Sequence, residues 1–266
     1  MGRLFKIEMK KLQKSTAMKV MLIVAAGLGV LSVGLNVLLD YLAKGLVEAE
    51  LGLSGYNIAL TMSYGDSDLL LMVVILMAVL IGGDFSARTL QTQVAAGYDR
   101  FSIILSRFLS GIVAYVILYI EYFLIIVGGI TIFYGWGEDI TSKVGLEHLG
   151  EIFANIGLGL LLAITFLAIY MLFMFLLKNV GGSIGVCVPG MLLVPSILQT
   201  VMMFNEDAAK ILSYTPIGQQ YEFTMSTMLM GQVAELDVVK FILVCVVWMV
   251  AFIGFNFLTF RKSELK

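Results

Sequence analysis

The chain has 266 residues, of which 60% are hydrophobic and 14% are charged, and its formal net charge is −2. A soluble domain carries about 45–50% apolar and about 25% charged residues, so this composition excludes an ordinary soluble protein. Apolar runs of about 20 residues indicate membrane-crossing helices, because each matches a hydrocarbon core about 30 Å thick. The alternating pattern of a membrane β-barrel is absent. We therefore predict an all-α membrane protein with a single transmembrane domain over residues 1–266.

The first segment, residues 3–19, is basic and amphipathic. Phe5, Met9 and Leu12 fall on one face of a helix, between six lysine and arginine residues. Such a pattern predicts an N-terminal interfacial helix on the anionic leaflet of the membrane. The alternative is a plain basic anchor that only orients the chain.

Six apolar runs follow, and we predict six transmembrane helices from them. Their expected ranges are about 20–40, 66–83, 108–134, 151–177, 181–204 and 238–260. The second run is too short to span alone, so its helix must extend back toward Ile58 or forward beyond Asp84. The fifth contains Pro189 and Pro195, which remove backbone hydrogen bonds and favour a kink.

The distribution of charge predicts the orientation. Thirteen of the 17 lysine and arginine residues lie in the N-terminal segment, the 84–107 connection, the 178 turn and the C-terminal tail. Basic residues are enriched on the cytosolic side of membrane proteins, so both termini are expected in the cytosol.

Three connections are then expected outside, and the first is the polar, acidic stretch 40–68. Residues 135–151 form an acidic connection with the only histidine, His148. Residues 205–237 are too apolar to extend freely into water, and a turn at 214–218 divides them. This pattern predicts an external re-entrant hairpin before the last span.

The sequence gives no sign of an enzyme. It has no phosphate-binding loop of the Gly-x-x-x-x-Gly-Lys-Ser/Thr type, and one histidine does not build a multi-histidine metal site. Cys187 and Cys245 lie in apolar runs and are expected to be buried free thiols. We predict no catalytic residue, metal, bound cofactor or nucleic-acid partner; if ATP drives the protein, another subunit binds it.

Polar side chains within the third span are candidates for a translocation path or a dimer seam. Glu121 is the one acidic residue in the middle of a span, where a carboxylate is costly to bury. Its alternative role is structural, as a carboxyl group bonded to a facing helix. Tyr115, Tyr119 and Tyr122 form a separate stripe, which either lines an amphipathic cavity or packs as ordinary aromatic core.

The polar stretch after the second span is the part of the sequence that says most about function. Residues 84–100 contain Asp84-Phe85, Arg88-Thr89-Leu90, Gly97-Tyr98 and Arg100 between two apolar runs. This segment resembles the cytosolic signature of type-2 ABC exporter permeases, in which an acidic residue precedes a Thr-Leu step and a small-residue turn precedes an arginine. The six-span topology, the basic N-terminal helix and the hairpin before the last span are similar as well. Within the family, the chain looks most like permeases of antimicrobial-peptide immunity and resistance exporters.

The resemblance implies a function and a set of site residues. The chain would be the transmembrane subunit of an ATP-driven exporter of an amphipathic or hydrophobic substrate, a peptide or lipid-like molecule, in the bacterial cytoplasmic membrane. It would pair with a second permease copy and with an ABC ATPase subunit that binds ATP and Mg²⁺. Asp84 would cap a coupling helix seated in the ATPase, and Arg88 and Arg100 would pair with its carboxylates. The coupling residues are expected to be Asp84, Phe85, Arg88, Thr89, Gly97, Tyr98 and Arg100.

Two other classes of protein remain open at this point. An ATP-independent secondary transporter needs several intramembrane charges and repeated halves, whereas only Glu121 qualifies and no repeat is visible. A membrane sensor or immunity protein without transport activity has the same composition.

Overall fold

A computed structural model describes residues 2–47, 53–63, 67–137, 149–228 and 236–262. Within these ranges all regular structure is helical, as predicted from the apolar runs. The helices are α1 (Gly2–Lys14), α2 (Thr16–Val47), α3 (Gly55–Ser63), α4 (Ser67–Ser86), α5 (Thr89–Ala95), α6 (Arg100–Tyr134), α7 (Leu149–Leu177), α8 (Val180–Phe204), α9 (Glu206–Leu212), α10 (Pro216–Met228) and α11 (Val238–Lys262). His148 lies outside the described residues.

Six of these helices are long and apolar enough to cross a membrane: α2, α4, α6, α7, α8 and α11. They correspond to the six predicted runs in order, which confirms a multi-pass helical architecture. The buried free thiols of Cys187 and Cys245 are also confirmed.

Three helices extend clearly further than their apolar runs, and the first is α2, which covers Thr16–Val47 against an expected range of about 20–40. The second span extends forward, since α4 continues through Asp84 to Ser86, while Ile58 belongs to the separate helix α3. The third begins at Arg100 rather than near residue 108. Asp99 precedes it, and its side chain accepts a hydrogen bond from the backbone N–H of Ser102 at 3.3 Å. This cap lets the helix begin two turns before the apolar run.

Helix α4 is the centre of the bundle. It is apolar around its whole circumference, and Val73, Val74 and Ala78 are fully buried. Neighbouring helices cover much of this apolar surface, because α4 contacts α6, α7 and α8. By contrast, α2, α8 and α11 expose many apolar side chains, as expected for helices that face lipid or another protein.

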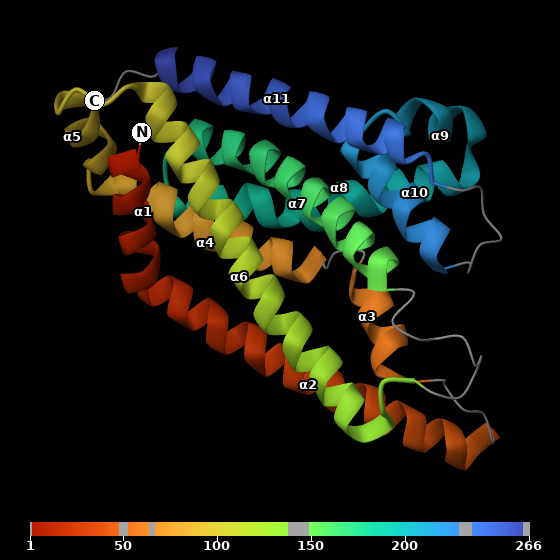
Figure 1. Ribbon diagram of the computed structural model, residues 1–266. Helices are drawn as coiled ribbons and strands as arrows, with labels where there is room; N and C mark the ends of the chain where they lie inside the picture. Colours follow the sequence, from red (N-terminus) through yellow and green to blue (C-terminus); the bar gives the residue numbers. More distant parts are fainter. Residues whose placement is uncertain (1, 48–52, 64–66, 138–148, 229–235, 263–266) are drawn as a thin grey trace.

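The bundle has two distinct ends. The start of α1, the end of α11 and the short helix α5 lie at one end, which we call the basic end (Figure 1). Helices α3, α9 and α10 lie at the other, which we call the opposite end (Figure 1). Helix α1 crosses the basic end and packs against α6.

The link between α7 and α8 is a tight turn at the basic end. Lys178 has a positive φ of 55°, and the Asn179 side chain caps α8 by accepting from the N–H of Gly182. Helix α8 then continues through Pro189 and Pro195 to Phe204. The turn brings the backbone of α8 close to α4, because a Cβ atom on Gly82 would lie 2.6 Å from the backbone nitrogen of Val180.

This close approach yields a matched pair of glycine substitutions. Gly82→Ala should destabilise the protein by about 1–3 kcal/mol, since the new methyl group meets backbone that cannot rotate away. Gly83→Ala should be neutral or slightly stabilising, because no atom lies within 4 Å of its Cβ position and alanine favours a helix. Thermal unfolding of the detergent-solubilised variants measures both. Equal melting temperatures for the two variants would contradict the observed helix packing.

Candidate functional site

The short helix α5 lies at the basic end, three residues after the central helix α4. Arg88 precedes α5 in the left-handed conformation with φ 56°, and Gly97 follows it with φ 84°. The two turns therefore set α5 apart from both long helices. Leu90 is only 1% exposed and anchors α5 to the bundle, whereas Arg88, Thr89 and Thr92 are exposed. One side of α5 thus faces outward from the protein.

A buried group of charged side chains lies beneath α5. Arg107 on α6 is 2% exposed and forms an ion pair with Glu8 on α1, which is 4% exposed. The second Nη atom of Arg107 lies 2.7 Å from Asp84 Oδ2 on α4. Lys11 on α1 also pairs with Asp84. We call these four residues the charge cluster.

The charge cluster also contacts α5. Arg107 Nη2 donates a hydrogen bond of 3.5 Å to the side-chain oxygen of Gln93 on α5. A single guanidinium group therefore joins α1, α4 and α5 to its own helix α6. Arginine suits this position because its planar fork of donors bonds several acceptors at fixed angles.

The cluster contains two carboxylates and two cations, so its formal charge is balanced. Burial raises the pKa of Glu8, while the positive charges of Arg107 and Lys11 act against the rise. The nearby carboxylate of Asp84 raises the Glu8 pKa further, and Gln93 lowers it by a hydrogen bond. Loss of either cation would leave one negative charge in the cluster without compensation.

Asp84 was expected to cap α5, and this expectation is wrong. Asp84 is still part of α4, where it is 3% exposed and turned toward Arg107 and Lys11. The cap position of α5 is occupied by Arg88, whose side chain makes no cap hydrogen bond. The difference arises because α4 continues three residues beyond its apolar run.

Arg100 is engaged within the chain. Its Nη1 atom donates to the backbone oxygens of Phe260 and Arg261, at 2.7 Å and 2.9 Å. The guanidinium also lies 5.6 Å from the centre of the Phe260 ring. Arg100 thereby caps the carbonyl end of α11 and ties it to the start of α6. Of the two arginines expected to meet a partner, only Arg88 is exposed.

The other predicted coupling residues occupy different environments. Phe85 stacks edge-on against Phe175 of α7, with ring centres 5.9 Å apart. Thr89 is exposed on α5, and Tyr98 is half-buried against the core. Gly97 adopts the positive φ expected of a turn glycine.

The amphipathic pattern of α1 differs in detail from the expected one. Its buried face consists of Leu4, Glu8 and Leu12, whereas Phe5 and Met9 are only partly buried. Leu12 therefore packs on the bundle. The exposed cations lie on the side facing away from this buried face: Arg3, Lys6, Lys10 and Lys14.

The three tyrosines predicted along the third span are buried in the core. Tyr115, Tyr119 and Tyr122 are 2%, 7% and 9% exposed, and the first two rings stack with centres 6.1 Å apart. The Tyr119 hydroxyl donates to the carbonyl oxygen of Met62 at 3.1 Å. These contacts are those of aromatic core packing. Glu121 is half-buried, and its Oε2 atom has no hydrogen-bond partner among the described residues.

Sequence reasoning did not identify Glu8, Lys11, Gln93 or Arg107 as site residues. One signal was present for Glu8, because it lies between Leu4 and Leu12 at helical spacing, on what becomes the buried face of α1. An acidic residue on the buried face of an otherwise basic helix requires a partner of opposite charge.

Comparison with protein-family models and curated proteins gives no match for this chain. Within the described ranges, no group of three His, Cys, Asp or Glu residues is placed to hold a metal ion. The function is therefore argued from the geometry of α5 and the charge cluster.

The charge cluster predicts a large effect of removing its arginine. Arg107→Gln leaves buried Glu8 without its ion-pair partner and leaves Asp84 with Lys11 alone, and it should reduce stability by about 3–5 kcal/mol. Adding Glu8→Gln to Arg107→Gln should restore part of the loss, because the unpaired carboxylate is removed. The matched control is Arg3→Gln, an exposed arginine, which should change stability by about 0.5 kcal/mol or less. Thermal unfolding in detergent measures all three; equal effects of the two single substitutions would refute the role of Arg107.

Proposed function

We propose that this chain is the transmembrane subunit of an ATP-driven exporter of the type-2 ABC class. In this proposal α5 is the coupling helix that seats in a separate ATPase subunit, which binds ATP and Mg²⁺. Closure of the ATPase pushes α5, and the push moves the membrane helices. The substrate is an amphipathic or hydrophobic molecule, and the permease works with a second copy of itself or a similar permease.

One observation carries the proposal: α5 is a short, exposed helix that is firmly attached to the most buried helix of the bundle. A loop that only connects two spans needs neither Leu90 as an anchor nor Gln93 as a link to Arg107. The attachment means that force on the exposed side of α5 reaches α4 through the two residues between these helices. It also reaches α1 and α6 through the charge cluster.

Helix α4 is suited to carry that force across the membrane. Its 20 residues extend about 30 Å at 1.5 Å per residue. Because α4 contacts α6, α7 and α8, a shift of α4 repacks the interior of the bundle. The basic end is the cytosolic end in this proposal, consistent with the enrichment of lysine and arginine there.

The elements at the opposite end support an external hairpin before the last span. Helices α9 and α10 are joined by a turn at Ser213–Thr215, and the turn and α10 make polar contacts with α11. Lys240 pairs with Glu222 at 3.2 Å, and the Trp248 indole donates to the carbonyl oxygen of Tyr214 at 2.9 Å. We propose that α9 and α10 form the re-entrant hairpin and that α1 is the interfacial helix.

Substitution of Arg88 tests the proposal most directly. No ion pair of Arg88 is seen within the described residues, and its side chain is exposed beside α5. Arg88→Glu should lower the ATPase activity of the reconstituted complex by about tenfold or more, since about 1.4 kcal/mol of lost contact suffices. The fold should be unaffected, because exposed substitutions cost about 0.5 kcal/mol or less.

Lys178→Glu provides the matched control for this experiment. It makes the same change of charge, at the same end, in a residue with nearly the same φ of 55°. Lys178 lies between α7 and α8 and does not adjoin α5, so the ATPase activity of this variant should stay close to that of the unmodified complex. Full activity in the Arg88 variant, or an equal loss in both variants, would contradict α5 as the coupling element.

A further inference from the structure

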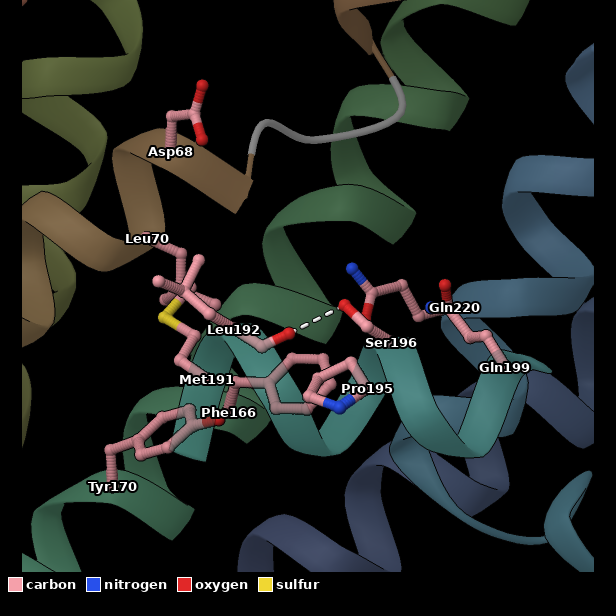
Figure 2. Close-up of a pocket in the computed structure, with 10 residues that line it drawn as sticks. All are labelled: Asp68, Leu70, Phe166, Tyr170, Met191, Leu192, Pro195, Ser196, Gln199 and Gln220. Atoms are coloured by element: carbon pink, nitrogen blue, oxygen red, sulfur yellow. Dashed lines mark hydrogen bonds between the residues drawn. The ribbon is translucent and has the colours of Figure 1, made fainter. Parts of the chain in front are cut away.

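A cavity of about 160 Å³ lies near the opposite end, between α4, α7, α8 and α10. Its apolar wall is formed by Leu70, Phe166, Tyr170 and Met191, which come from three different helices. Figure 2 shows these four side chains together on one side of the cavity. Such a wall accepts an apolar group of a ligand.

The other side of the cavity is polar and carries no charge. It includes Ser196, Gln199 and Gln220, whose side-chain polar atoms lie on the same side in Figure 2. Each glutamine amide offers a donor and an acceptor. The Ser196 hydroxyl donates to the carbonyl oxygen of Leu192 at 2.6 Å, so its lone pairs face outward from α8 as acceptors.

Pro195 leaves one backbone acceptor of α8 without its usual partner. Proline has no N–H, so the carbonyl oxygen of Met191 lacks the donor that a helix supplies four residues later. Met191 and Pro195 both line the cavity. A carbonyl group without its helical donor is costly in a membrane span and favours a ligand that brings an N–H group.

The one acidic residue at the cavity does not define its polarity. Asp68 is exposed at the start of α4, and in Figure 2 its carboxylate points away from the other lining side chains. A positive charge on the ligand is therefore not required. The lining instead matches an uncharged ligand with an apolar group next to an amide.

We propose that this cavity binds an uncharged, amide-bearing apolar ligand, such as an apolar residue of a peptide. The apolar group lies against Phe166, Tyr170 and Met191, and the amide bonds to Gln199, Gln220 and the Met191 carbonyl. As the substrate site of an exporter, this inference rests on the proposed function. The inference also connects the cavity to the charge cluster, because Leu70 and Asp84 lie on the same helix, α4, about 21 Å apart along its axis.

A photo-reactive probe tests the site on the permease alone, reconstituted in lipid nanodiscs without any ATPase. The probe is N-acetyl-photoleucine methylamide, which carries a diazirine on an apolar side chain between two amides. Irradiation followed by peptide mass spectrometry should locate adducts on α7 between residues 166 and 170 and on α8 between residues 189 and 199. Ser196→Phe fills the cavity and should reduce this labelling about tenfold.

Two controls make the result specific. Ile197→Phe introduces the same side chain one residue later, at a position that is 60% exposed and does not line the cavity, and labelling should be unchanged. The methyl ester of N-acetyl-photoleucine lacks one N–H and should label about two- to tenfold less, the range expected for one hydrogen bond.

Equal labelling of the Ser196→Phe and Ile197→Phe variants would overturn the site. Equal labelling by amide and ester, with displacement by a fatty acid, would overturn the amide preference and identify a lipid-chain site instead. Both results leave α5 and its ATPase partner untouched, because no nucleotide hydrolysis is measured. An unlabelled cavity with normal coupling through Arg88 would therefore remove this inference and leave the proposed function standing.

Discussion

The buried guanidinium of Arg107 is the interaction on which the basic end depends. A full charge in a position that is 2% exposed is tolerable only with acceptors in direct contact, and Glu8 and Asp84 provide them. Because these acceptors lie on α1 and α4, balancing one charge fixes the relative positions of three helices. Gln93 extends the same constraint to α5. The short helix is therefore held in place by an interaction that begins beneath it.

The second constraint is the contrast between a covered helix and exposed ones. Helix α4 has no polar face and packs against α6, α7 and α8, whereas α2, α8 and α11 expose apolar side chains to the surroundings. Movement of α4 consequently disturbs packing throughout the bundle. The proposed exporter uses this arrangement: α5 receives the push at one end of α4, and the cavity lined by Leu70 lies near the other end.

Much of the fold could be predicted because the membrane imposes simple requirements. A run of about 20 apolar residues has few alternatives to a spanning helix, so all six spans were identified. The ends of the helices were harder to predict, because polar residues continue a helix when a cap or a buried partner is available. Asp99 starts α6 early, and the ion pairs of Asp84 keep the end of α4 helical. Neither effect is visible in hydropathy.

The candidate site could be predicted only in part for a related reason. Helix α5 is local, and the turn residues around it indicated its position. The partners of Arg107 and Arg100 are distant in sequence, since Glu8 precedes Arg107 by 99 residues and Phe260 follows Arg100 by 160. Pairing over such separations depends on how the helices pack, which one sequence does not specify. Hence Arg100 was expected on a partner surface, whereas it caps α11.

The central claim is that the exposed side of α5 contacts a separate ATPase. The most direct measurement places a photo-crosslinking amino acid at Thr92 on α5, and in a second variant at Tyr214, which is 66% exposed at the opposite end. After irradiation of intact cells, the account predicts a crosslink from position 92 to a soluble nucleotide-hydrolysing subunit and none from position 214. Absence of that subunit at position 92, or its capture at position 214, would contradict the account.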